Sequence, residues 1–77
     1  MVLNEKEAKL LKFVADKKLV SSVELRKYIA ENSNSSEEGE RILKRLQDLE
    51  FIAELDILFD KSYIITNKGL DELKTKS

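Results

Sequence analysis

The chain has 77 residues, of which 38% are charged and 42% hydrophobic, and its formal net charge is −1. This length allows one domain with one small core, and the composition is typical of a folded globular domain. The sequence has no cysteine and no histidine, which excludes a disulfide framework, leaves no ordinary zinc ligands and removes the commonest general base.

The longest uninterrupted apolar run is three residues, so we expect no membrane span. The first residues lack the basic-then-apolar order of a signal peptide, which favours a cytoplasmic location. There is no glycine-rich phosphate loop, no nucleophile elbow and no cluster of metal-ligand residues. We therefore expect no metal, no cofactor and no small-molecule ligand, and we do not expect an enzyme.

Three segments open with a polar residue that is followed three positions later by glutamate, which is the pattern of a helix-capping box. The pairs are Asn4 with Glu7, Ser21 with Glu24, and Ser35 with Glu38. They predict helices over residues 4–17, 22–31 and 36–50, with a short extended piece at Leu19 and Val20 after the first. Within the third helix, Gly39 predicts a point of close approach to another helix, because glycine inside a helix is otherwise unfavourable.

The apolar spacing then changes from three or four residues to two. Apolar residues at positions 51, 53, 55, 57 and 59 alternate with residues 52, 54, 56, 58 and 60, three of which are acidic. This period of two predicts a strand with one buried face. Residues 60–62 are expected to form a turn, and residues 63–65 a second strand of the hairpin. Thr66 or Asn67 then caps a short closing helix whose apolar contacts are Leu70 and Leu73.

This order of elements, together with two motifs, resembles the winged helix-turn-helix family of small prokaryotic or viral transcription regulators. Residues 44–52, Lys-Arg-Leu-Gln-Asp-Leu-Glu-Phe-Ile, are similar to the end of a recognition helix that enters the first wing strand. Residues 63–69, Tyr-Ile-Ile-Thr-Asn-Lys-Gly, are similar to the second wing strand and the start of the last helix. The resemblance implies an α+β fold in a single domain over residues 1–77, with a three-helix core, a two-stranded wing and a short C-terminal helix. Glu50 stands where many relatives have glycine.

The resemblance also implies a DNA-binding transcriptional regulator that reads the major groove of double-stranded DNA with residues 36–50. A homodimer through the closing helix or the first helix would read two half-sites. The residues expected to contact DNA are Ser35, Ser36, Arg41, Lys44 and Arg45, with Lys61 on the wing. Arg41 is the best candidate for reading a base, because the forked donors of arginine suit guanine.

The charges oppose this interpretation. Residues 36–50 hold three cations and five anions, and the wing over residues 51–65 has Lys61 as its only cation. DNA-binding domains usually neutralise phosphates with many cations. Lys6, Lys9 and Lys12 share a helix face, which is either a solvated surface or a secondary phosphate contact that Arg26 and Lys27 would extend.

The alternative function is a protein–protein interaction module on the same fold. It is supported by the acidic third helix and by the apolar residues Ile57, Leu58 and Phe59, which exceed what one buried strand face needs.

Overall fold

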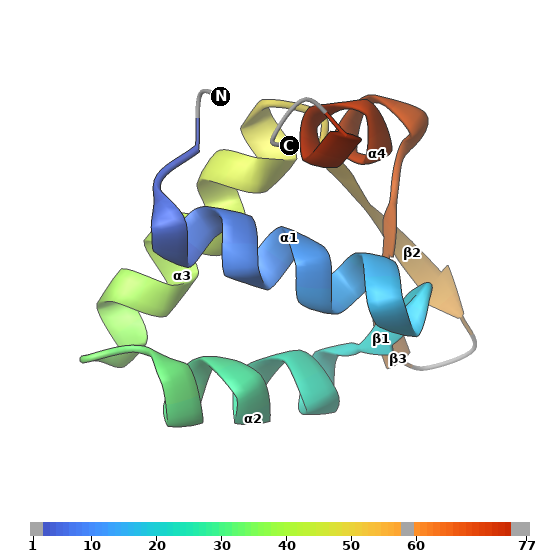
Figure 1. Cartoon of the computed structure of the whole chain (residues 1–77). Helices are drawn as coiled ribbons and strands as arrows, with labels where there is room; N and C mark the ends of the chain where they lie inside the picture. The colour runs from blue at the N-terminus through green and yellow to red at the C-terminus, as the bar shows by residue number, and fades with distance from the viewer. Residues whose placement is uncertain (1–2, 58–59, 75–77) are drawn as a thin grey trace.

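The computed structural model describes residues 3–57 and 60–74 of the chain and has an α+β architecture (Figure 1). Four helices and three strands follow in the order α1 (Glu5–Lys17), β1 (Leu19–Ser21), α2 (Ser22–Asn32), α3 (Ser36–Asp48), β2 (Ile52–Ile57), β3 (Asp60–Ile65) and α4 (Asn67–Lys74). The α-helical core followed by a hairpin and a closing helix is compatible with the expected winged helix.

The three caps expected for α1, α2 and α3 are present, and the hydroxyl of Thr66 accepts the N–H of Gly69 at 3.0 Å at the start of α4. Asn4 and Glu7 form a complete capping box, in which each side chain accepts the backbone N–H of the other residue, at 2.8 and 3.0 Å. The hydroxyls of Ser21 and Ser35 cap α2 and α3 by accepting the N–H three residues later, at 3.2 and 3.1 Å. The predicted starts of α1, α2 and α3 are therefore confirmed. They could be predicted because a cap depends only on residues that are close together in the sequence.

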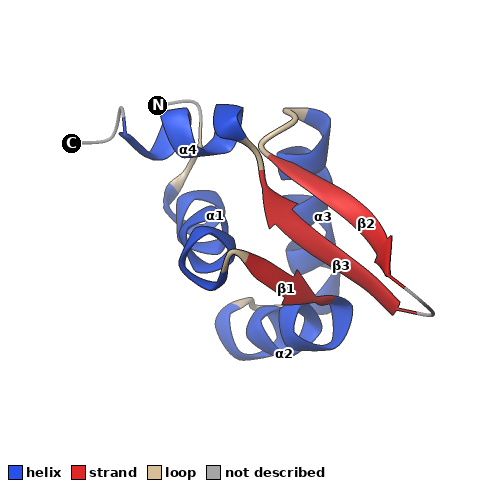
Figure 2. Cartoon of the chain, turned by 90° about the vertical axis from the view of Figure 1, so that its right-hand side faces the viewer, coloured by secondary structure: helices blue, strands red, loops and turns tan. Residues whose placement is uncertain are grey.

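The three strands form one antiparallel sheet in the order β1–β3–β2, so the short piece after α1 is a strand of the same sheet as the hairpin (Figure 2). The predicted turn at residues 60–62 is wrong. Asp60, Lys61 and Ser62 pair in register with Ile57, Asp56 and Leu55, and they begin β3. Leu58 and Phe59, which were expected to belong to an apolar interaction surface, lie outside the described residues.

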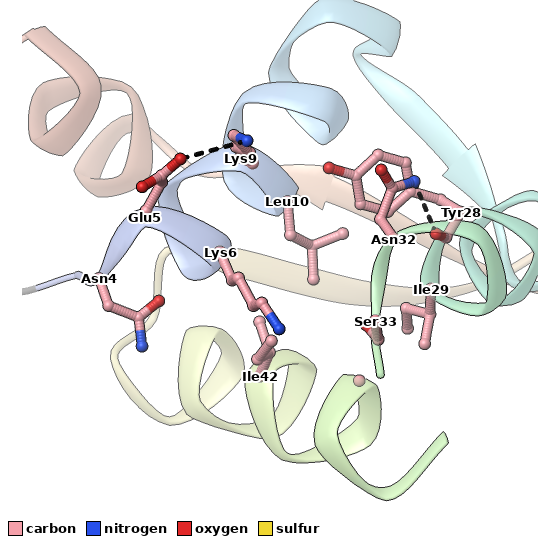
Figure 3. Close-up of a pocket in the computed structure, with 11 residues that line it drawn as sticks. Asn4, Glu5, Lys6, Lys9, Leu10, Tyr28, Ile29, Asn32, Ser33 and Ile42 are labelled. Atoms are coloured by element: carbon pink, nitrogen blue, oxygen red, sulfur yellow. Dashed lines mark hydrogen bonds and ion pairs between the residues drawn. The ribbon is translucent and has the colours of Figure 1, made fainter. Parts of the chain in front are cut away.

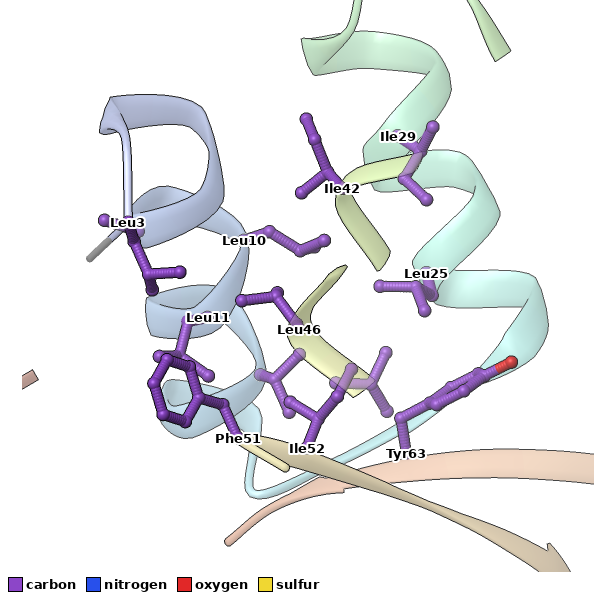
Figure 4. Packing of buried hydrophobic residues seen from close by; sticks show 13 residues of the cluster. Leu3, Leu10, Leu11, Leu25, Ile29, Ile42, Leu46, Phe51, Ile52 and Tyr63 are labelled. Carbon is purple, nitrogen blue, oxygen red and sulfur yellow. The ribbon is translucent and has the colours of Figure 1, made fainter. Parts of the chain in front are cut away.

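Helices α1, α2 and α3 pack on one face of the sheet, and α4 packs against α1. The buried side chains lie among the helices and between the helices and the sheet (Figure 4). Ile52 and Tyr63 point from the sheet into this core, beside Val20, which is fully buried. The expected buried face of β2 is therefore wrong from Ala53 onward. Because Ile52 takes the core position, Leu55 faces outward and is 38% exposed.

The third helix ends at Asp48 rather than at Glu50, because the chain leaves it through a left-handed residue. Glu50 has φ = 64°, and the N–H groups of Glu50 and Phe51 donate to the carbonyls of Gln47 and Leu46 at 2.9 and 3.0 Å. This is a Schellman ending, which usually carries glycine. The hydroxyl of Thr66 donates to the Glu50 carbonyl at 2.7 Å and so joins this corner to the end of β3.

Both glycines lie at close contacts. A side chain on Gly39 would overlap the Ile29 side chain, which confirms the expected close approach of α3 to α2. A side chain on Gly69 would overlap the backbone carbonyl of Phe51. In α4, Leu73 packs against the core as expected, but Leu70 is 38% exposed, so the expected core contact of Leu70 is wrong.

Candidate nucleic-acid interface

A groove of about 390 Å³ runs between α2, α3 and β3 on the side of α3 that faces the hairpin. Each of these elements brings one cation to it: Arg26 from α2, Lys44 from α3 and Lys61 from β3. Glu40 is the one anion among its lining residues, which otherwise are Ser22, Leu25, Ile29, Leu43, Gln47 and Tyr63. The groove lining is therefore net positive, although the whole chain is net negative.

The three cations of this groove differ in whether they form an ion pair within the protein. Arg26 and Lys44 are exposed and make no ion pair with any described residue. The ammonium of Lys61 lies 3.7 Å from the carboxylate of Glu54, which also accepts the Tyr63 hydroxyl at 3.3 Å. Burial, with Glu54 adding to it, raises the pKa of Tyr63 above its usual value.

Of the six residues expected to contact DNA, the groove brings together Lys44 and Lys61. Ser35 caps α3 with its hydroxyl, and Ser36 is the exposed first residue of that helix. Neither serine lines the groove. Ser22, the first residue of α2, lies at the groove instead and presents a helix N-terminus there.

Arg41 and Arg45 line a second groove, between α1 and α3. The Nε of Arg45 donates to the carboxylate of Glu7 at 2.9 Å, and the Glu7 side chain is 9% exposed. In the same groove, the ammonium of Lys6 lies 2.8 Å from the carboxylate of Glu38. Lys6, and after it the backbone N–H of Asn34, hold the pKa of Glu38 below its usual value. These contacts join α1 to α3.

Arg26 was expected to extend the surface formed by the lysines of the first helix, but it lines the same groove as Lys44. Lys6 and Lys9 are instead paired with Glu38 and Glu5. The packing of α2 on α3 brings Arg26 to the same groove as Lys44. In the sequence, Gly39 indicated this contact, because it marks where the two helices meet.

A crevice of about 420 Å³ lies among α1, α2 and the start of α3 (Figure 3). Leu10, Ile29 and Ile42 form its apolar wall, and Lys6, Lys9 and Asn32 lie at its rim. Both lysines are paired within the protein, with Glu38 and Glu5, and the apolar wall is formed by packed helices. We therefore regard this crevice as the seam between three packed helices.

Among the described residues, none of the helices has the length and apolar character needed to cross a membrane. The same part of the chain holds no group of three or more metal-binding side chains. Comparison with models of protein families, with curated proteins and with solved structures finds no match for this chain.

Proposed function

We propose that this protein is a DNA-binding transcriptional regulator that holds double-stranded DNA against the groove between α2, α3 and β3. The observation that carries the proposal is the meeting of Arg26, Lys44 and Lys61 from three separate elements in one groove. Two of these cations have no ion-pair partner among the described residues and are available to phosphates.

The arrangement suits a helix-turn-helix mode of binding, in which the second helix of the motif enters the major groove. Lys44 lies on the ridge of α3, since it lines the grooves on both sides of this helix. The N-terminal N–H groups of α2, at Ser22, are suited to a backbone phosphate because a helix N-terminus attracts anions. Arg41 on the neighbouring turn of α3 remains the candidate base reader.

Binding through so few cations is expected to be weak and moderately dependent on salt. Three neutralised phosphates give a slope of about −2.7 in a plot of log K against log salt. A homodimer would double the number of phosphate contacts and read two half-sites, so we include a dimer in the proposal.

The test is a titration of a fluorescent random-sequence duplex at several salt concentrations. Arg26→Ala, Lys44→Ala and Lys61→Ala should each weaken binding and reduce the salt slope by about one. Lys12→Ala is the matched control, because Lys12 is an exposed cation of α1 outside the groove. The proposal fails if the wild-type protein does not bind at low salt, or if Lys12→Ala weakens binding as much as the groove variants do.

The second candidate function is a protein–protein interaction module, and one observation favours it. The outer face of the sheet carries the apolar residues Leu19, Ala53, Leu55 and Ile64, and Leu19 and Leu55 are 48% and 38% exposed. None of the helices over residues 3–57 and 60–74 lies in front of this face (Figure 2). Sedimentation of the wild-type protein and of Leu19→Ser and Leu55→Ser variants tests whether this face binds a second copy of the chain. Self-association that the variants abolish supports this candidate, and a wild-type monomer, or self-association that both variants retain, contradicts it.

A further inference from the structure

Within the described part of the chain, strand β2 lies at the edge of the sheet and pairs with β3 on one side only (Figure 2). In an antiparallel pair, alternate residues bond to the neighbouring strand, and the residues between them direct their N–H and C=O groups the other way. The N–H of Thr66 donates to the carbonyl of Phe51 at 3.0 Å. The residues of this segment whose backbone groups bond to the neighbouring strand are therefore Phe51, Ala53 and Leu55. The backbone groups of Ile52, Glu54 and Asp56 point to the open edge.

The side chains along this edge alternate in chemistry. Glu54 and Asp56 are exposed on the face that also carries Lys61 and Tyr63, whereas Ala53 and Leu55 lie on the opposite, outer face. Lys61 stands opposite Asp56 and 3.7 Å from the carboxylate of Glu54. Of the side chains that pair with these two acids on β3, Lys61 is the cation and Tyr63 is a neutral phenol, so one negative charge is left unmatched.

This pattern opposes pairing between two copies of the chain. A second β2 could add in antiparallel orientation only in registers that match the outward-pointing groups. The two registers with the longest overlap set either Glu54 against Glu54 of the second copy or Glu54 against Asp56 twice. Like charges directly opposite each other destabilise a strand pair. The edge is therefore selective for a different kind of strand.

We propose that the β2 edge binds an extended segment of another protein in which lysine or arginine alternates with apolar residues. The backbone of this segment bonds to Ile52, Glu54 and Asp56, as when a peptide adds a strand to an exposed sheet edge. Its cations lie beside Glu54 and Asp56. Its apolar residues lie beside Ala53 and Leu55 and extend the apolar outer face of the sheet.

The test uses the full chain, labelled with nitrogen-15, and synthetic hexapeptides that alternate lysine with valine or glutamate with valine. The lysine peptide should bind at least about tenfold more tightly than the glutamate peptide at low salt. On binding, the amide N–H groups of Glu54 and Asp56 should shift and become protected from hydrogen exchange. Those of Ala53 and Leu55, which already bond to β3, are internal controls and should keep their protection.

Two further probes separate strand addition from simple charge attraction. A lysine peptide that is N-methylated on alternate backbone nitrogens should lose binding, because it cannot complete the ladder. The Glu54→Lys/Asp56→Lys variant should prefer the glutamate peptide, and the Glu54→Gln/Asp56→Asn variant, which keeps the side-chain shapes, should show no preference. Equal binding of both peptides to the wild-type protein, or unchanged binding of the N-methylated peptide, overturns the proposal. No nucleic acid is present, so the result does not depend on the DNA-binding groove.

Discussion

The carboxylate of Glu7 links the start of α1 to Arg45 in the last turn of α3, and it also accepts a hydrogen bond from the N-cap residue of α1. One oxygen accepts the N–H of Asn4 at 3.0 Å, and the other accepts the Nε of Arg45 at 2.9 Å. Glu7 is buried, at 7% exposure, although it is charged. A charged group in this position needs such partners, because burial without them is strongly unfavourable.

Replacement of Arg45 should therefore destabilise the fold even though its side chain is half exposed. We expect Arg45→Ala to lower the free energy of unfolding by about 2 kcal/mol, since it leaves a buried carboxylate without its charged donor. Lys9→Ala is the control, because its pair with Glu5 is exposed and spans one helix turn, and such pairs contribute about 0.3–0.5 kcal/mol. Urea denaturation measures both, and equal effects would refute the role given to Glu7.

The two glycines should respond differently to alanine. Gly69→Ala places a methyl group on the backbone carbonyl of Phe51, which cannot yield, so we expect a loss of about 2–3 kcal/mol. In Gly39→Ala the new methyl group overlaps the Ile29 side chain, and the higher helix propensity of alanine offsets about 1 kcal/mol of this clash.

Ile29→Leu tests the contact at Gly39, because it removes the γ-methyl branch that the new group would meet. The double variant Gly39→Ala/Ile29→Leu should be more stable than the sum of the two single changes predicts. Thermal or urea denaturation of the four proteins measures this coupling. Strict additivity would show that the clash at Gly39 is not the source of the instability.

Removal of the charge on Glu54 should strengthen binding to duplex DNA. Glu54 draws Lys61 to within 3.7 Å and places a negative charge beside the groove. In Glu54→Gln the lysine is released toward phosphate, and we expect binding to tighten about threefold and the salt slope to steepen. Glu50→Gln, an exposed acid outside this groove, is the control. If the two variants bind alike, the effect is one of net charge alone.

Stability should fall in acid partly because of Glu38. Lys6 and the Asn34 N–H lower the pKa of this carboxyl in the folded state, relative to a usual value of 4.5. Its stabilising contribution is therefore complete above the unfolded pKa and is lost as the pH falls through the folded pKa. Urea midpoints measured from about pH 7 to about pH 3 should decline less in Glu38→Gln than in the wild-type protein. Parallel declines would exclude a contribution from Glu38.

The sequence was most informative where structure depends on neighbours in the chain. The starts of α1, α2 and α3 follow from local hydrogen bonds of Asn4, Ser21 and Ser35, which any sequence with this spacing can make. The face of β2 could not be predicted in the same way, because Phe51 and Ile52 are both apolar and either could begin the buried set. The contact of Ile52 with the helices decides it. Likewise, Asp60 and Lys61 are typical turn residues that become strand residues through pairing with β2.

The candidate groove depends on contacts that no local pattern reports. Lys44 and Lys61 were predicted from the winged-helix resemblance, and both lie in the groove. Arg26 was assigned to another surface, since its place beside them is fixed by how α2 packs on α3. The pairing of Arg45 with Glu7 joins residues that are distant in the sequence, and no local sequence pattern predicts it.

The left-handed corner at Glu50 sets the direction in which the hairpin leaves α3. This corner is held by backbone hydrogen bonds and by the hydroxyl of Thr66. None of these groups belongs to the exposed side chains of the groove or of the β2 edge. The side chains of both surfaces can therefore diverge during evolution, or be exchanged by design, while the frame that presents them keeps its shape.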